Sequence, residues 1–166
     1  MYKLSVDLNE YLQLYERINQ VVSDIPRDQL QWKKNETVWS ITEVLTHLLD
    51  HAFVVNFRLR EVLSGSSVQL PAFNQDEWVK GQYANEGNIT ELLETYRSVL
   101  QYNGQLLRRL KNDDWHKSGI NPKNQEVTVE EIIQSFISHV YHHIKQIKRI
   151  ADDFNISVQI ERGNHV

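Results

Sequence analysis

The stretch of sequence that decides the fold is SITEVLTHLLDHAFVVNFRLREVLSG, residues 40–65. It begins with Ser40 and places Glu43 three residues later, which is the spacing of a helix capping box. Apolar residues then recur at alternating steps of four and three, as they do on the buried face of a helix. The residues on this stripe are Ile41, Leu45, Leu48, Ala52, Val55, Leu59 and Val62. Residues 40–65 are therefore predicted to form an amphipathic helix that ends at Gly65.

Helical periodicity recurs over residues 7–23, 88–110 and 128–150, and the last of these segments again carries a capping-box pair, Thr128 and Glu131. The apolar positions of residues 7–23 are Leu8, Leu12, Tyr15, Ile18 and Val22. Those of residues 88–110 are Ile89, Leu92, Leu93, Tyr96, Val99, Leu100, Leu107 and Leu110. Those of residues 128–150 are Ile132, Phe136, Val140, Ile147 and Ile150. The connection 66–87 is expected to hold one short helix near residues 76–83, and residues 115–124 are expected to form a turn-rich loop or a small hairpin. The pattern predicts an all-α four-helix bundle.

Length and composition narrow the possible functions. The 166 residues, 40% of them hydrophobic, predict a single domain over residues 1–166. The absence of cysteine excludes disulfides, a thiolate nucleophile and cysteine-ligated metal sites. A net charge of −4, from 18 basic and 22 acidic residues, argues against nucleic-acid binding. We see no signal peptide and no apolar run near the roughly 20 residues that span a bilayer, so we expect a cytoplasmic protein with no membrane association.

Two short stretches contain five of the seven histidines. His139 and His143 are four residues apart, so a helix presents both imidazoles on one face, and they lie on the apolar stripe. A buried polar group without a partner costs about 1–3 kcal/mol, whereas a divalent metal would satisfy both ring nitrogens. His142 points away from the stripe and is expected at the surface.

A second pair, His47 and His51, lies on the flank of the stripe in residues 40–65. Metal sites in bundles are built by helices that each offer such ligands inward. One pair alone would more often be a solvated face or hydrogen-bonded core histidines, but two pairs on separate helices favour a metal. Spacing does not distinguish His47 from His51.

Other polar residues receive no ligand role from this pattern. Tyr141 and Gln146 share the helix of His139 but are expected to point elsewhere, and His51 is the better candidate for a supporting residue. His116 and His165 are given no role.

Two stretches of the chain resemble a known family. Trp39-Ser-Ile-Thr-Glu-Val-Leu-Thr-His47-Leu resembles the signature helix of the DinB-like, or YfiT-like, metal-dependent hydrolases. Thr128-Val-Glu-Glu-Ile, followed by His139-Val-Tyr-His-His143-Ile-Lys-Gln146-Ile, resembles the second signature of that family. The resemblance implies an up-down-down-up bundle and a divalent metal held by His47, His139 and His143.

The same resemblance suggests a function. Three neutral histidines leave a coordination position open, as in catalytic sites, and an all-imidazole set suits zinc or nickel, with iron or copper also compatible. The family includes hydrolases and S-transferases that use low-molecular-weight thiols, so the expected substrate is a small molecule. The alternative is a non-catalytic metal-binding or dimerising bundle.

A second apolar group on residues 40–65 predicts a homodimer. Leu49, Phe53 and Phe57 lie on the side away from the core stripe, and exposed apolar patches often mark interfaces. In the alternative, the connection 66–87 folds back over them with Phe73 and Trp78.

Overall fold

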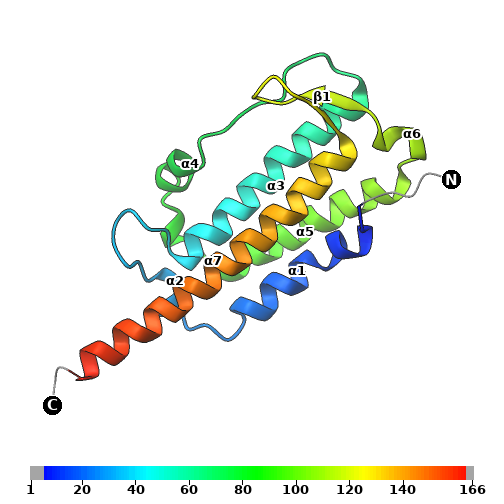
Figure 1. The fold of residues 1–166 in the computed structure, drawn as a ribbon. Coiled ribbons are helices and arrows are strands. Elements are labelled where there is room, and N and C mark those ends of the chain that lie inside the picture. Colours follow the sequence, from blue (N-terminus) through cyan, green and yellow to red (C-terminus); the bar gives the residue numbers. More distant parts are fainter. Residues whose placement is uncertain (1–5, 164–166) are drawn as a thin grey trace.

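The computed structural model describes residues 6–163, and its side chains are described through residue 160. Four long helices form the bundle drawn in Figure 1: α1 (Leu8–Val22), α3 (Ile41–Ser64), α5 (Ile89–Arg109) and α7 (Val129–Gly163). The predicted all-α four-helix bundle is confirmed. None of the described helices is long and apolar enough to cross a membrane.

Short elements connect the long helices. They are α2 (Arg27–Gln31), α4 (Gln75–Gly81), the 3₁₀ turn η1 (Ala84–Glu86), α6 (Asn112–Trp115), and the antiparallel strands β1 (Ser118–Ile120) and β2 (Glu126–Thr128). The short helix expected near residues 76–83 is α4, and the turn-rich segment forms a small hairpin in which Ser118 pairs with Thr128. The sequence did not predict α2 and α6, because helices of five and four residues are too short to show a period.

The bundle has the up-down-down-up order. Both α1 and α3 pack against α5 and α7, so α1 and α3 lie diagonally opposite although they are consecutive long helices. In Figure 1, α1 and α7 run in one direction, and α3 and α5 run in the other. This arrangement places α3 beside α7, the two helices that carry the histidine pairs.

Local hydrogen bonds fix where α3 and α7 begin. Ser40 and Glu43 form a reciprocal capping box, in which the Ser40 Oγ accepts from the Glu43 N–H and the Glu43 carboxylate accepts from the Ser40 N–H. Thr128 and Glu131 exchange the same two bonds at the start of α7. Gly65 ends α3 at a φ of 74°, a left-handed conformation that glycine adopts without steric cost. Both predicted capping boxes are therefore present.

The core confirms the predicted stripes on α3 and α7, all of whose members are buried. The stripe predicted for α1 is partly wrong: Tyr11 and Leu14 are buried beside Ile18 and Val22, while Leu8, Leu12 and Tyr15 are only partly buried. Two adjacent rows of α1 are apolar, and α1 packs against both α5 and α7, so neither row alone forms the buried face. Leu12 packs directly against α5, because a Cβ at Gly104 would lie 2.6 Å from Leu12 Cδ2.

The C-terminal part of α7 extends beyond the bundle (Figure 1). The predicted stripe ended at Ile150, but the helix continues to Gly163. Ile156 and Ile160 on this extension are 54% and 58% exposed. The helix therefore continues beyond Ile150, the last buried apolar residue of α7 among those the structure describes.

Candidate metal centre

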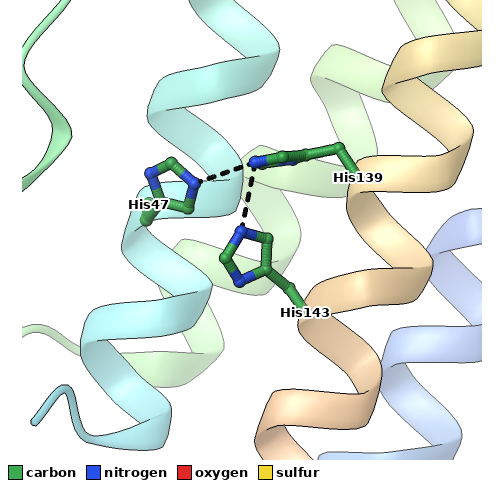
Figure 2. A group of neighbouring side chains, drawn as sticks. All are labelled: His47, His139 and His143. Carbon is green, nitrogen blue, oxygen red and sulfur yellow. Dashed lines mark hydrogen bonds between the residues drawn. The ribbon is translucent and has the colours of Figure 1, made fainter.

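Three histidine side chains from two helices meet inside the bundle. His47 lies on α3, and His139 and His143 lie one turn apart on α7 (Figure 2). The Nε2 atom of His139 lies 3.2 Å from Nε2 of His47 and 3.1 Å from Nε2 of His143. His47 and His143 are buried, at 1% and 6% exposure, and His139 is half-buried. The structure thus converges three ring nitrogens on one point, with all three ligand atoms within 4.8 Å of one another.

Hydrogen bonding alone does not satisfy these three nitrogens. His143 Nδ1 donates to Gln146 Oε1 at 2.7 Å, so a neutral His143 has only a lone pair at Nε2. His139 Nε2 carries either a proton or a lone pair, so it forms a normal hydrogen bond with only one of its two neighbours. A cation that faces three lone pairs would satisfy all of them.

The spacing also fits one metal ion. Nitrogens bound to one zinc at about 2.0–2.1 Å, with tetrahedral angles, lie roughly 3.3 Å apart. The observed separations of 3.2 and 3.1 Å are close to this value. Among the described residues, this is the group of histidine and acidic side chains that could hold a metal, and it contains no carboxylate.

The electrostatics of the site keep the imidazoles neutral. Burial, together with charge repulsion from the neighbouring His143 and His51, lowers the pKa of His47 to about 3. Burial likewise lowers the pKa of His139 to about 2 and that of His143 below its ordinary value. Neutral imidazole is the form that binds metal, so the site is ready for coordination at pH 7.

Gln146 contradicts its predicted orientation. It was expected to point away from the site, but its Oε1 accepts the hydrogen bond from His143 Nδ1. The overlooked signal was its spacing, because residues three apart on a helix share a face. The Nδ1 atoms of His47 and His139 have no such hydrogen-bond partner in the described part of the chain.

His51 lies beside the cluster without joining it. Its ring centroid is 3.9 Å from that of His139, and its ring stacks on Phe136 at 5.5 Å with an interplanar angle of 9°. Burial lowers the pKa of His51 to about 4. Its Nδ1 is buried and has no hydrogen-bond partner within residues 6–163.

The remaining histidines are accounted for as far as the structure describes them. His142 is exposed, as predicted, and its ring lies edge-on against His143, with centroids 5.2 Å apart. His116 is the residue that follows the last turn of α6 and does not belong to the three-histidine cluster. His165 lies outside the described residues.

Aromatic side chains cover the cluster on the side of the connection. Phe73 lies nearly parallel to His47 at 6.1 Å and contacts His51 at 6.2 Å, and Trp78 packs on Phe73 at 5.0 Å. Trp39, just before α3, lies 5.1 Å from His47. The sequence did not predict Phe73 in this position, because no periodicity links an irregular connection to a helix face.

Comparison with known proteins gives a family. The model of the DinB superfamily matches residues 10–147. Two Oceanobacillus iheyensis proteins, whose names mark them as inferred metal-dependent hydrolases, are similar in sequence. One is 25% identical over 150 residues, covering 86% of this chain and 84% of the relative, and the other is 21% identical over 144 residues, covering 87% and 83%.

Solved structures share the fold. YfiT from Bacillus subtilis, described as a probable metal-dependent hydrolase with an unusual four-helix bundle topology, superposes with a TM-score of 0.82 at 16% identity over 93% of both chains. A mycothiol-dependent maleylpyruvate isomerase superposes with a TM-score of 0.68 at 14% identity, over 89% of this chain and 63% of that one. At these identities the structures support the fold alone.

Proposed function

The chain belongs to the DinB superfamily, and from this premise we propose that it is a metal-dependent enzyme acting on a small molecule. The observation that carries the proposal is the convergence of the Nε2 atoms of His47, His139 and His143. These three residues would hold one divalent metal, with zinc or nickel as first candidates and iron next. A bound divalent metal supplies a Lewis acid that lowers the pKa of a coordinating water or thiol.

The chain's own residues support this chemistry in distinct ways. Gln146 fixes the ring of His143 through Nδ1, which leaves Nε2 free for a metal. Phe73 and Trp39 shield the cluster from bulk water. His51 lies against His139 and supports that ring from the side, while its own Nδ1 has no hydrogen-bond partner among the described residues.

Two reaction classes fit this site. Hydrolysis is supported by the names of the Oceanobacillus relatives and by the description of YfiT. Transfer that uses a low-molecular-weight thiol is supported by the shared fold with a mycothiol-dependent isomerase. The thiol must come from the cosubstrate, because the chain has no cysteine. Assays of ester hydrolysis and of thiol consumption, each with and without chelator, distinguish the two classes.

Metal analysis of the purified protein tests the proposed ligands. We expect one divalent metal per chain, and a sharp loss of metal in the His47→Ala, His139→Ala and His143→Ala variants. His142→Ala is the matched control, because His142 is on the same helix but exposed. Full metal occupancy in His139→Ala would overturn the ligand set, and a larger loss in His51→Ala than in His47→Ala would reassign the ligand on α3.

The competing class is a bundle that keeps a metal for structure only. A structural metal stabilises the fold by its binding free energy, so its removal should lower the melting temperature strongly. A catalytic metal should be required for turnover whatever its effect on melting. Activity that survives complete chelation would contradict the proposal.

We also propose that the protein is a homodimer. Phe53 and Phe57 on α3 are 48% and 50% exposed. Phe73 of the connection packs near His47 and does not cover these two phenylalanines. Leu49, by contrast, is partly buried against the core. The cytoplasmic location and the single domain over residues 1–166 stay predictions.

A further inference from the structure

A cavity of about 140 Å³ lies next to the histidine cluster. It is bounded by α3, α7, the hairpin and the connection. The connection and the hairpin are joined by the hydrogen bond from Leu70 N to the Ile120 carbonyl at 2.8 Å. One part of its wall is apolar and consists of Val55, Leu70, Val127, Ile132 and Phe136. A protein cavity of about 150 Å³ holds a benzene molecule, so this one matches a small, compact apolar group.

His51 connects the cavity with the proposed metal centre. The side chain lines the cavity, and its ring centroid lies 3.9 Å from that of His139. His51 therefore belongs both to the wall of the cavity and to the group of rings around the three converging nitrogens. This proximity is what a substrate pocket of the site requires.

Arg58 contributes a positive charge to the cavity wall. Its Nε and Nη2 both donate to the Pro71 carbonyl, at 3.1 and 2.5 Å, and it forms no ion pair with a described carboxylate. A guanidinium has five N–H donors, so its remaining donors are available to a ligand. The guanidinium fork matches the two oxygens of a carboxylate.

Glu131 also lines the cavity, but among the described residues it forms no ion pair with Arg58. Glu131 is exposed, and its Oε2 accepts from Thr128 N at 2.8 Å and from Thr128 Oγ1 at 3.0 Å. This carboxylate therefore serves the N-terminal cap of α7. Arg58 is the cationic group of this cavity, and its donors are not held by a described carboxylate.

We infer that this cavity binds the substrate and that Arg58 holds a carboxylate group of it. The inference rests on the proposed function and supplies its substrate class: small carboxylic acids with a compact apolar body. The apolar body would lie against Val55 and Phe136, next to His51 and the metal centre.

Benzoate and its uncharged analogue benzamide are suitable probes, because they differ mainly in the charge that Arg58 would recognise. NMR titration of the chelator-treated protein measures their affinities without direct binding of benzoate to a metal. We expect tighter binding of benzoate than of benzamide, with shift changes at Val55, Leu70 and Val127. Arg58→Gln keeps a donor for the Pro71 carbonyl but removes the charge, so it should weaken benzoate by at least about tenfold and leave benzamide unchanged.

Two further variants control this measurement. Arg60→Gln alters the neighbouring arginine, which bonds Asn103 on α5, and should leave benzoate affinity unchanged. Arg58→Lys keeps a charge and should bind benzoate more tightly than Arg58→Gln. Equal affinity of benzoate and benzamide for the unmutated protein, or benzoate affinity unaffected by Arg58→Gln, would overturn the inference.

Zinc stoichiometry of the same preparations separates this inference from the proposed function. If zinc binds but benzoate binding does not depend on Arg58, the carboxylate site is wrong and the metal centre stands. If no zinc binds, the proposed function fails, while Arg58-dependent benzoate binding would still support the carboxylate site.

Discussion

At the scale of single residues, the hydrogen bond between His143 and Gln146 sets one histidine of the cluster apart. His143 Nδ1 has a protein acceptor, whereas the Nδ1 atoms of His47 and His139 have no hydrogen-bond partner among the described residues. Such a bond fixes the tautomer that leaves Nε2 free for a metal. The ring of His143 is therefore oriented in advance of metal binding.

Removal of this bond should weaken metal binding. We expect Gln146→Ala to lower zinc affinity by about 10- to 100-fold, because loss of a residue that orients a ligand typically costs this much. Gln146→Glu keeps an acceptor oxygen and should restore most of the affinity. Competition titration with a chromogenic chelator measures both, and Gln134→Ala, at an exposed position of α7, is the control. Equal affinities of Gln146→Ala and Gln134→Ala would show that the bond does not matter for binding.

The lowered histidine pKa values predict how the stability of the metal-free protein depends on pH. The pKa is about 3 for folded His47 and about 4 for His51, against about 6.5 in an unfolded chain. Below pH 6.5 the unfolded state therefore binds more protons, and the free energy of unfolding falls as the pH falls. Between pH 7 and 5 one such histidine contributes a loss of the order of 1–2 kcal/mol.

Urea unfolding of chelated protein at several pH values measures this loss. His51→Gln should reduce the slope of stability against pH, because it removes one of the histidines whose pKa is lowered in the folded protein. Stability that does not change between pH 7 and 5 would contradict neutral, buried histidines.

At the scale of elements, the N-terminus of α3 combines a local and a tertiary interaction. Ser40 caps the helix through Glu43, and its hydroxyl donates to Asn85 Oδ1 of η1 at 2.6 Å. Asn85 in turn donates to the Gln31 carbonyl at the end of α2 at 3.0 Å. One serine therefore starts the helix that carries His47 and ties two short elements to it.

Ser40→Ala should destabilise the protein by about 1–3 kcal/mol, since it removes both a helix cap and a buried hydrogen bond. Thermal or urea unfolding followed by circular dichroism measures the change. Ser98→Ala is the control: its hydroxyl bonds Glu94 O within α5 and is exposed. A loss no greater than that of Ser98→Ala would show that the cap contributes little.

At the scale of the whole molecule, the exposed aromatic pair on α3 bears on assembly. Phe53 and Phe57 keep about half of their surface in water although the bundle around them is well packed. A two-fold interface is the commonest way to bury a self-complementary patch.

The double variant Phe53→Glu, Phe57→Glu should be a monomer with its helical content largely kept, because neither side chain belongs to the core. Light scattering and circular dichroism measure the two properties. A monomeric unmutated protein at micromolar concentration would contradict the homodimer.

The sequence by itself determined the features that depend on neighbours along the chain. The stripe of α3, both capping boxes and the pairing of His139 with His143 on one face all follow from periodicities of three and four. The periodicity of α1 was ambiguous, because two of its rows are apolar, and so its buried row was predicted only in part.

The tertiary structure decided which side chains meet. Spacing alone did not distinguish His47 from His51, and the family resemblance favoured His47. In the structure, His47 Nε2 lies next to His139 Nε2, whereas the ring of His51 stacks on Phe136. The rotation and register of α3 against α7 set this difference, and they result from the packing of the whole core. The same holds for Phe73, which approaches the histidines because the connection folds over α3, and for the Pro71 carbonyl that accepts from Arg58. Periodicity specifies the faces of a helix, whereas the contacts between faces depend on every element packed around them.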